Sequence, residues 1–450
     1  MSNSVNKIKI VRIAPIHKSP LKYLLKKYPD LPDLPYKEQM SIHSMEGVSY
    51  GSGFSTAMNE LDYDAHELVY DFEPMQKRWA IENSIKFNSD SYEYEILLAQ
   101  LRKVQPDVVL FQGNAYMIPD KELHQLKKKI PSIKLLLLHL AYPVAPHKIS
   151  CMDHIFAGYP ELYEYYQKKG LPVSLLYHGF DHHVLEKIQF TNKSIPISFC
   201  GSSGYGFYDH NVRYWTLYRL LQSTNLHLYV REIEYPSSGL KIPYKKLNVS
   251  NQPSNGKFKE KITLKKVARF SSRYIRQEIM KRVEGIKKGL LSFELQYIGS
   301  ELIEDSSAFD ILYKSIRPKN KLLTLFPDKC QGEVHGLDFY KILGSSFATF
   351  HIGTDPVVYQ NAGAMRIFES AGVGTALFIE QTQNIQDLLI PEKEIIVYNS
   401  TRDCIKKIKY YLEDPDELVR IGINAQKRVL SDHTILKRCR DIDSKIKELL

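Results

Sequence analysis

Short apolar segments alternate with longer segments of helical length along most of the chain. They are rich in Val, Ile and Leu, as is typical of strands that are buried on both faces. Ten such segments occur: KIKIVRI at 7–13, HELVYDF at 66–72, DVVLFQG at 107–113, IKLLLLHL at 133–140, PVSLLYHG at 172–179, PISFCGS at 196–202, NLHLYV at 225–230, KLLTLF at 321–326, SFATFHIG at 346–353 and TALFIE at 375–380. This alternation predicts an α/β protein with parallel sheets and crossover helices. Parallel sheets bind ligands beyond the carboxyl ends of their strands, so we seek function in the loops that follow these segments.

The chain is long enough for two domains, and a polar stretch marks the expected boundary. Its 450 residues exceed the size at which one hydrophobic core stops growing, about 250–300 residues. The stretch around 183–195 is polar and lies between two strand signals. We therefore predict a first domain over 1–188 and a second over 189–432. A Pro, Ser, Asn and Lys-rich segment at 235–260 predicts an insertion in the second domain, over about 235–292.

The positive charge of the chain is concentrated in that insertion. The net charge is +10, yet residues 241–290 hold 15 Lys and Arg against three Glu, so the remainder is close to neutral. This distribution gives no support for nucleic-acid binding by the whole molecule. Apolar residues at helical spacing predict a basic amphipathic helix over 262–291. Two interpretations stay open: the helix packs on the sheet with its charges in water, or it binds an anionic membrane surface.

Cysteine usage and the N-terminal residues indicate a cytoplasmic protein. The five cysteines are scattered, and none has the paired spacing of a zinc site or a disulfide framework. The start MSNSVNKIKIVRI lacks the apolar segment of a signal peptide, and no uninterrupted apolar run reaches the roughly 18 residues of a membrane span. We expect a cytoplasmic location, with peripheral attachment to the inner face of the membrane as the alternative.

The most informative stretch lies in the second domain. It begins with HGLDFYKILGSSFATFHIG at 335–353, continues through NAGAMRIFESAGVGTALFIE and ends with YYLEDPDELVRIGINAQKRVLSDHT. This stretch resembles the C-terminal domain of GT-B glycosyltransferases, and most closely the glycosyltransferase-like group that includes the spore maturation protein CgeB. The resemblance implies two Rossmann-like domains facing each other across a cleft. It implies a nucleotide-sugar donor on the second domain, an acceptor on the first, and a last helix over 433–450 that returns to the first domain.

Glu369 and Arg366 are the main candidates for binding the donor nucleotide. A carboxylate accepts two hydrogen bonds at once, so Glu369 can bind both ribose hydroxyls of a nucleotide. Arg366 lies three residues earlier, on the same face of a helix, where it can pair with the donor diphosphate or hold Glu369 in place. The alternative for both residues is an ordinary surface ion pair.

Asn361 departs from the family pattern. Many retaining GT-B enzymes carry two glutamates eight positions apart, and the resemblance places the first of them at 361. The Asn361 amide can bond a sugar but carries no charge, so the sequence leaves the donor sugar and the anomeric outcome undecided. The glycines at 363, 372 and 374 are expected to let backbone amides approach the diphosphate near a helix N-terminus. Gly372 is the candidate that we assign to donor binding.

Two further loops resemble donor-binding segments of the family. SYGSGFSTAMNELDYDAHELVYDF at 49–72 resembles its first glycine-rich loop; Gly51 and Gly53 would turn the chain beneath the cleft and leave Ser52 free for ligand oxygens. The alternative is an ordinary turn. CGSSGYGFYDHNVRYWTLYRLL at 200–221 matches the opening of the family's second domain, so its diphosphate candidates are Gly201, Ser202 and Arg213.

His139 is the candidate for the catalytic base. It ends the LLLLHL segment, where several family members place a histidine that faces the donor sugar, and we expect it to project into the cleft. If the enzyme inverts configuration, His139 takes the proton of the acceptor hydroxyl. If it retains configuration, the family's front-face route has the leaving diphosphate take that proton. The alternative is a structural histidine at a strand end.

No metal and no cofactor are expected. Asp62-Tyr63-Asp64 reads as a DxD metal motif, but it falls at the end of the helix after the glycine-rich loop, where capping explains it better. The histidines between 139 and 183 lack compact spacing with acidic residues: they are His139, His147, His154, His178, His182 and His183. The predicted function is therefore transfer of a sugar to a glycan, a lipid-linked acceptor or a protein. The rivals are a non-catalytic glycan-binding protein and a sugar-nucleotide epimerase of the same fold.

Overall fold

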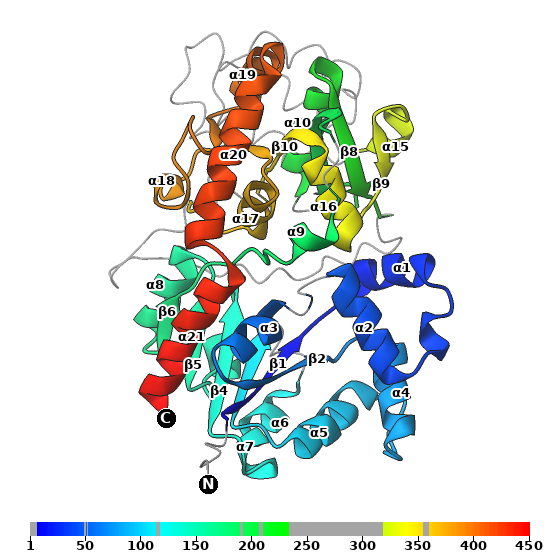
Figure 1. Cartoon of the computed structure of the whole chain (residues 1–450), viewed down its shortest axis with the longest axis vertical. Helices are drawn as coiled ribbons and strands as arrows, with labels where there is room; N and C mark the ends of the chain where they lie inside the picture. The colour runs from blue at the N-terminus through cyan, green and yellow to red at the C-terminus, as the bar shows by residue number, and fades with distance from the viewer. Residues whose placement is uncertain are drawn as a thin grey trace, which may run out of the picture.

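The protein consists of two α/β domains, each built on a six-stranded parallel sheet (Figure 1). The computed structural model describes residues 7–48, 51, 53–113, 118–189, 192–206, 210–233, 318–353 and 360–450. The insertion predicted for 235–292, with its basic helix at 262–291, lies outside these residues. None of the helices in the described part of the chain has the length and apolarity needed to cross a membrane.

The first sheet has the strand order β2-β1-β3-β4-β5-β6, and all its pairs are parallel. Every residue of Leu135–Leu140 is buried, as expected for a strand that helices cover on both faces. The strands are β1 (Lys9–Ala14), β2 (Asp64–Val69), β3 (Val108–Gln112), β4 (Leu135–Leu140), β5 (His154–Ala157) and β6 (Val173–Leu175). The helices along this part of the chain are α1 (Lys18–Lys27), α2 (Tyr36–Glu46), α3 (Gly53–Glu60), α4 (Glu73–Glu82), α5 (Tyr92–Val104), α6 (Asp120–His124), α7 (Leu126–Lys129) and α8 (Pro160–Lys168).

The second sheet has the order β12-β11-β10-β7-β8-β9 and is also parallel. Counted from β7, this is the strand order of dinucleotide-binding Rossmann folds, and its order reverses between β7 and β10. The strands are β7 (Ile195–Ser202), β8 (Leu226–Arg231), β9 (Cys330–Gly332), β10 (Ser346–Phe350), β11 (Ala376–Glu380) and β12 (Ile396–Tyr398). The helices from the crossing onwards are α9 (Val184–Lys187), α10 (Asn211–Ser223), α15 (Leu322–Leu325), α16 (Gly336–Gly344), α17 (Met365–Gly372), α18 (Ile385–Leu388), α19 (Thr401–Glu413), α20 (Pro415–Asp432) and α21 (Ile435–Leu449).

The structure confirms the predicted α/β architecture and corrects one predicted strand. The apolar segment at 321–326 forms the short helix α15 instead. Its first amides, from Leu322 and Leu323, donate to the carboxylate of Glu232 at 2.8 and 3.2 Å. A carboxylate at the amino end stabilises a helix, because the first amides have no partner within it. The short strands β5, β9 and β12 were not predicted.

Within its described residues, the chain crosses between the domains twice, and both crossings lie side by side. The segment between β6 and β7 carries it from the first domain to the second, and the segment between α20 and α21 carries it back. Phe180 N donates to His433 O at 2.8 Å, and Ile435 N donates to Phe180 O at 2.9 Å. The Thr434 side chain caps α21, which packs on α3 in the first domain (Figure 1).

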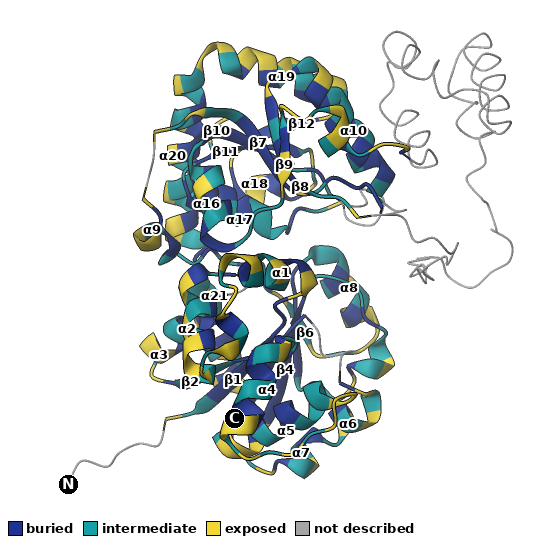
Figure 2. Cartoon of the chain, turned by 90° about the vertical axis from the view of Figure 1, so that its right-hand side faces the viewer, coloured by how far each residue is buried: buried dark blue, intermediate teal, exposed yellow. Residues whose placement is uncertain are grey.

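Each sheet forms the centre of its own core. Figure 2 shows buried strands inside both domains and exposed positions mainly on the outer helices. Polar contacts join the domains on the side of α1: Tyr23 Oη donates to Asp338 at 2.7 Å, and Lys27 Nζ lies 2.8 Å from the same carboxylate. Ser19 also donates to Glu333 of the second domain.

Candidate functional site

Two arginines and a glutamate lie together where the strand order of the second sheet reverses. Arg366 and Glu369 belong to α17, which precedes β11, and Arg213 belongs to α10, which follows β7. Arg366 Nη2 donates to Cys200 O at 2.9 Å, near the end of β7. Arg213 donates to Ser202 O at 3.4 Å and to Ile352 O, just beyond β10, at 3.2 Å. The three side chains therefore lie at the carboxyl ends of β7 and β10, where a sheet of this order binds its ligand.

Arg366 is held in place but retains an unused donor. Its Nε lies 3.8 Å from Glu369 Oε2, and both side chains are 18% exposed. Its guanidinium also lies 4.2 Å from the centre of the Phe339 ring, which suits a cation–π contact. Within the described part of the chain, Nη1 of Arg366 is buried without a hydrogen-bond partner. A buried donor without a partner is costly, so a bound anion that accepts from it would stabilise the site.

Arg213 adds a second buried positive charge. Burial, followed by the charge of Arg366, lowers the pKa of this guanidinium to about 10. Burial and the charges of Arg366 and Arg213 likewise lower the pKa of His351 to about 3, so this neighbour is neutral. Nε of Arg213 also has no partner among the residues that the structure describes. Two close guanidiniums with unused donors form a site for an anion with several oxygens.

Glu369 is the hydrogen-bond acceptor beside the two arginines. Burial raises its pKa from the ordinary value, and the charge of Arg366 opposes that rise. Because the two oxygens of a carboxylate offer about four acceptor positions, the pair with Arg366 leaves room for further donors such as ribose hydroxyls. Arg366 and Glu369 thus lie side by side on α17 as the helical spacing predicts, and their roles toward a ligand stay predictions.

Gly201 and Ser202 end β7 beside this group. A Cβ at Gly201 would meet the Phe199 ring at 3.6 Å, which is ordinary contact, although its φ of 152° is rare for other residues. Ser202 Oγ accepts from Gly204 N at 3.2 Å and so stabilises the turn after the strand. Its hydroxyl proton is not used in that bond, so both residues stay candidates for binding a diphosphate.

Asn361 binds a carboxylate of the first domain. Asn361 N and Nδ2 donate to Glu161 Oε1 at 2.9 and 3.1 Å, and Gln360 N donates to the same oxygen at 2.6 Å. Glu161 lies in the first turn of α8, and its Oε2 is buried without a partner among the described residues. The amide that was expected to face the sugar thus holds a contact between the domains. Glu161 was not predicted from the sequence, where its one signal is its place after the short strand β5.

His139 was expected to project into the cleft, but its side chain is buried. It is buried in β4, with Gln112 Nε2 2.9 Å from Nδ1 and Leu176 O 3.0 Å from Nε2. The Leu176 carbonyl can only accept, so Nε2 carries the proton and Nδ1 accepts from the Gln112 amide. Burial lowers the pKa of His139 to about 4. A neutral ring with both nitrogens bonded has no free lone pair for an acceptor hydroxyl, and this corrects the expected geometry of a base.

The first glycine-rich loop is bound to the protein itself. Gly51 O accepts from Arg12 Nη2 at 2.8 Å, and the φ of Gly51 is 50°. A Cβ at Gly53, the first residue of α3, would lie 2.5 Å from Asp181 Oδ2. Gly53 is therefore required for close approach to a carboxylate of the crossing segment. Ser52 lies outside the described residues.

The glycines around α17 also differ from the expectation. Gly372 is the last residue of α17, at the carboxyl end of the helix, where the dipole disfavours an anion. A Cβ there would lie 2.4 Å from the Phe180 ring. A Cβ at Gly363 would lie 2.6 Å from Gly158 O. The absence of side chains at these positions is explained by close packing, which corrects the reason for placing Gly372 against a diphosphate.

The discounted DxD motif takes part in surface ion pairs. Asp62 pairs with Lys7 at 2.7 Å, and Asp64 pairs with His66 at 3.0 Å. Between them, Tyr63 Oη donates to Asp443 of α21 at 2.7 Å. The two carboxylates thus have different partners.

His17 is a further residue that the sequence analysis missed. It follows β1 with a φ of 64° and a ψ of 156°, a strained conformation for a residue with a side chain. The amides of Ile16 and His17 both donate to the carboxylate of Asp71, at 2.7 and 3.0 Å. These two bonds hold the turn at the carboxyl end of β1, and the strain has no signal in the sequence.

Known proteins are similar to this chain in one segment of sequence and in the whole fold. Residues 312–444 match the model of a protein family described as glycosyl transferase-like. A glycosyltransferase from Rickettsia africae is similar over 99% of this chain and 99% of its own, with 11% identity and a TM-score of 0.51. HepE from Anabaena, in complex with UDP-glucose, covers 98% of this chain and 100% of its own, with 9% identity and a TM-score of 0.49. Sucrose-phosphate synthase from Thermosynechococcus elongatus covers 98% and 99%, with 10% identity and a TM-score of 0.47. No curated protein matches the chain in sequence.

The fold and the family match both point to glycosyltransferases. The R. africae structure shares the two-domain arrangement over nearly the full length of both chains, and the segment matched to the family contains Arg366 and Glu369. The protein thus has a two-domain fold similar to that of a glycosyltransferase, and residues 312–444 match the glycosyl transferase-like family. The glycosyl transferase-like segment, residues 312–444, includes the last four strands of the second sheet, β9 to β12.

Proposed function

We propose that the protein transfers a sugar from a nucleotide-sugar donor, with the donor diphosphate between Arg213 and Arg366 and the ribose on Glu369. The observation that carries this proposal is a pair of half-buried guanidiniums at the β7 and β10 strand ends, each with one buried donor that has no partner among the described residues. Guanidinium groups bind phosphate oxygens bidentately and keep their charge when they are buried. Two positive charges also neutralise the leaving diphosphate, so this chemistry requires no metal at that position.

The proton of the acceptor hydroxyl goes to the leaving diphosphate in this proposal. The acceptor oxygen bonds to the anomeric carbon, the bond from that carbon to the phosphate oxygen breaks, and the released phosphate oxygen takes the proton. Support comes from His139, because both of its ring nitrogens already have partners. The protein's contribution is to position the reactants and to stabilise charge. This route retains the configuration of the donor sugar.

The acceptor is a glycan, a lipid-linked molecule or a protein in this proposal, and it binds on the first domain. The basic segment 262–291 supports a position at an anionic membrane surface, because each Lys or Arg near such a surface gains about 1 kcal/mol. A cytoplasmic enzyme attached in this way would meet lipid-linked acceptors of the cell envelope.

Binding of two ligands tests the assignment of the three residues separately. Pyrophosphate carries only the part that we assign to the arginines, whereas a nucleoside diphosphate also carries the ribose. We expect Arg366→Ala and Arg213→Ala to weaken both ligands, and Glu369→Ala to weaken the nucleoside diphosphate alone, by roughly 10- to 100-fold for lost hydrogen bonds to a charged group. Titration calorimetry with the purified variants measures both affinities.

A matched control is available in α20. Glu417 and Arg420 form an exposed pair three residues apart, with Arg420 Nε 2.7 Å from Glu417 Oε2. Glu417→Ala removes a similar pair far from the strand ends and should leave both affinities unchanged. Equal affinities for the wild type and Glu369→Ala would contradict the ribose assignment. Binding without nucleoside diphosphate release from any of a panel of donors would favour the non-catalytic rival, and conversion of the donor without an acceptor would favour the epimerase.

A further inference from the structure

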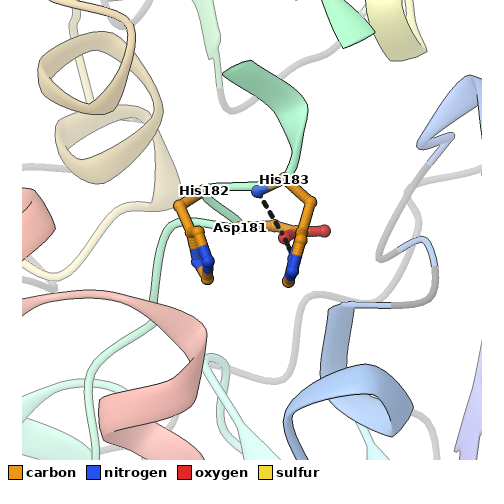
Figure 3. A group of neighbouring side chains, drawn as sticks. All are labelled: Asp181, His182 and His183. Atoms are coloured by element: carbon orange, nitrogen blue, oxygen red, sulfur yellow. Dashed lines mark hydrogen bonds and ion pairs between the residues drawn. The ribbon is translucent and has the colours of Figure 1, made fainter. Parts of the chain in front are cut away.

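The first crossing between the domains carries three metal-ligating side chains that point to one side. Asp181, His182 and His183 lie between β6 and α9, directly before the first turn of that helix. Figure 3 shows both imidazole rings projecting from the same side of the backbone, with the Asp181 carboxylate beside the ring of His183. One ligand atom from each residue lies within 4.8 Å of the other two. All three side chains are partly buried.

Hydrogen bonds fix two of the three side chains. Asp181 Oδ1 lies 2.9 Å from His183 Nδ1 and also accepts from His183 N at 3.2 Å. The rings of His182 and His183 lie 4.2 Å apart between centres, at an angle of 32°. Nδ1 of His182 is buried without a hydrogen-bond partner among the residues that the structure describes. A buried ring nitrogen without a partner is costly, and a cation would supply the missing interaction.

We propose that Asp181, His182 and His183 bind a divalent transition-metal ion such as Zn²⁺. Two imidazole nitrogens and one carboxylate oxygen form a ligand set that Zn²⁺ and its neighbours in the first transition row accept. Bonds of about 2.1 Å in a tetrahedral site place two ligand atoms about 3.4 Å apart, so a pair at the 4.8 Å limit closes by about 1.4 Å on binding. Three protein ligands leave a further position open for water. The metal takes the place of the proton between Asp181 Oδ1 and His183 Nδ1, and the neutral ring of His183 then carries its proton on Nε2.

The sequence predicts no metal here, and the reason is the local backbone. Metal motifs in helices and strands space their ligands so that they share one face, whereas three consecutive residues in either element point in different directions. The turn into α9 brings His182 and His183 to the same side (Figure 3). The structure therefore assigns a site that the spacing alone does not reveal.

The surroundings of this cluster belong to both domains. Asp181 contacts the position of Gly53 at the start of α3. On the other side, Tyr340 of α16 is partly buried, and this burial together with the charges of Glu369 and Asp181 raises its pKa. A metal at Asp181 thus lies one side chain away from the proposed donor site. It would fix the crossing segment against both domains.

Metal titration of the tag-free, chelator-treated protein tests the site. We use the full chain with Cys151→Ser, which removes the one half-buried thiol, because thiolates also bind Zn²⁺. Calorimetry should show one Zn²⁺ per chain, and Co²⁺ should bind with the visible absorption of nitrogen and oxygen ligands. The melting temperature should rise with the concentration of free metal, because the unfolded chain lacks the arranged ligands. These measurements need no nucleotide, so they stand apart from the proposed transferase activity.

Single substitutions decide whether the metal is bound by these residues. His182→Ala and His183→Ala should each weaken Zn²⁺ binding at least tenfold, since loss of even an indirect support of a ligand costs 10- to 100-fold. Asp181→Asn removes the charge, keeps the shape beside Gly53 and should have the same effect. The control is His66→Ala: His66 pairs with Asp64 at 3.0 Å, and the described residues place no third ligand beside this pair. Affinity that stays unchanged in His182→Ala and His183→Ala, or the absence of stoichiometric binding, overturns the proposal. Circular dichroism confirms that each variant is folded.

Discussion

The ion pair between Arg12 and Glu67 is the most deeply buried one among the described residues and offers a direct test of the fold around the first glycine-rich loop. The two residues lie opposite each other on β1 and β2. Arg12 Nε lies 2.7 Å from Glu67 Oε2, and the side chains are 2% and 6% exposed. Arg12 also donates to Gly51 O, and Glu67 accepts from Ser55 N at 3.0 Å. The pair thus joins the sheet to the loop and to α3.

We expect Arg12→Met to lower the free energy of unfolding by about 3–5 kcal/mol, because removing one partner leaves the other as an unpaired buried charge. For a domain of this size, that loss corresponds to a fall in melting temperature of about 10 °C. The double variant Arg12→Met/Glu67→Leu should recover most of the loss, since an apolar pair of similar volume leaves no buried charge. Urea unfolding of the wild type, both single variants and the double variant measures the coupling.

The pH dependence gives an independent check of the same reasoning. Burial raises the pKa of Glu67, and the charge of Arg12 opposes that rise; without Arg12 the pKa rises further. An acid whose pKa is higher in the folded state favours folding as the pH falls through that pKa. The destabilisation in Arg12→Met should therefore be largest near about pH 8 and smaller near about pH 5.5. A cost below about 1 kcal/mol, or a double variant as unstable as the single one, would refute the argument.

Three further predictions concern residues whose expected roles the structure changes. His139→Gln should keep most of the turnover, because the ring already bonds Gln112 and the Leu176 carbonyl; a loss of 100-fold or more would restore the base assignment. Burial lowers the pKa of His139 to about 4 and that of His178 to about 3. The stability that these neutral rings contribute is complete above about pH 6.5 and is lost as the pH falls towards 4. The urea midpoint of the wild type should therefore fall over that range. In His139→Gln the midpoint should fall less steeply, because one of the two rings is absent. Gly372→Ala should lower the free energy of unfolding by about 1–3 kcal/mol through overpacking on Phe180, with unchanged affinity for pyrophosphate; a weakened affinity at equal stability would support the diphosphate role instead.

The architecture was predictable because the strands are buried on both faces and so appear as continuous apolar runs. The prediction of a strand at 321–326 was wrong because an apolar run of six residues does not distinguish a helix from a strand. The deciding contact, from Glu232 to the first amides of α15, comes from about 90 residues away. β9 has only three residues, two of them exposed, so it has no apolar run to detect.

The candidate site was predictable only where it is local in sequence. Arg366 and Glu369 are three residues apart on one helix, so their pairing follows from helical spacing. The partner of Asn361 is Glu161, 200 residues away, and no pattern within either segment indicates it. The burial of His139 depends in the same way on Gln112 and on the backbone at Leu176, which belong to other segments of the first domain.

Several glycines are explained by close packing at the first crossing between the domains, and not by contact with a ligand. A Cβ at Gly53 would meet Asp181, and a Cβ at Gly372 would meet Phe180. A Cβ at Gly179 would lie 2.8 Å from Ile435 N in the returning chain. The first domain, the second domain and the second crossing thus each approach residues 179–181 too closely for a side chain. Substitutions at these glycines should therefore change the relative position of the domains before they change any contact to a donor. A loss of activity at these positions is then evidence about packing. Only a lower affinity for pyrophosphate at unchanged stability would be evidence for contact with the donor.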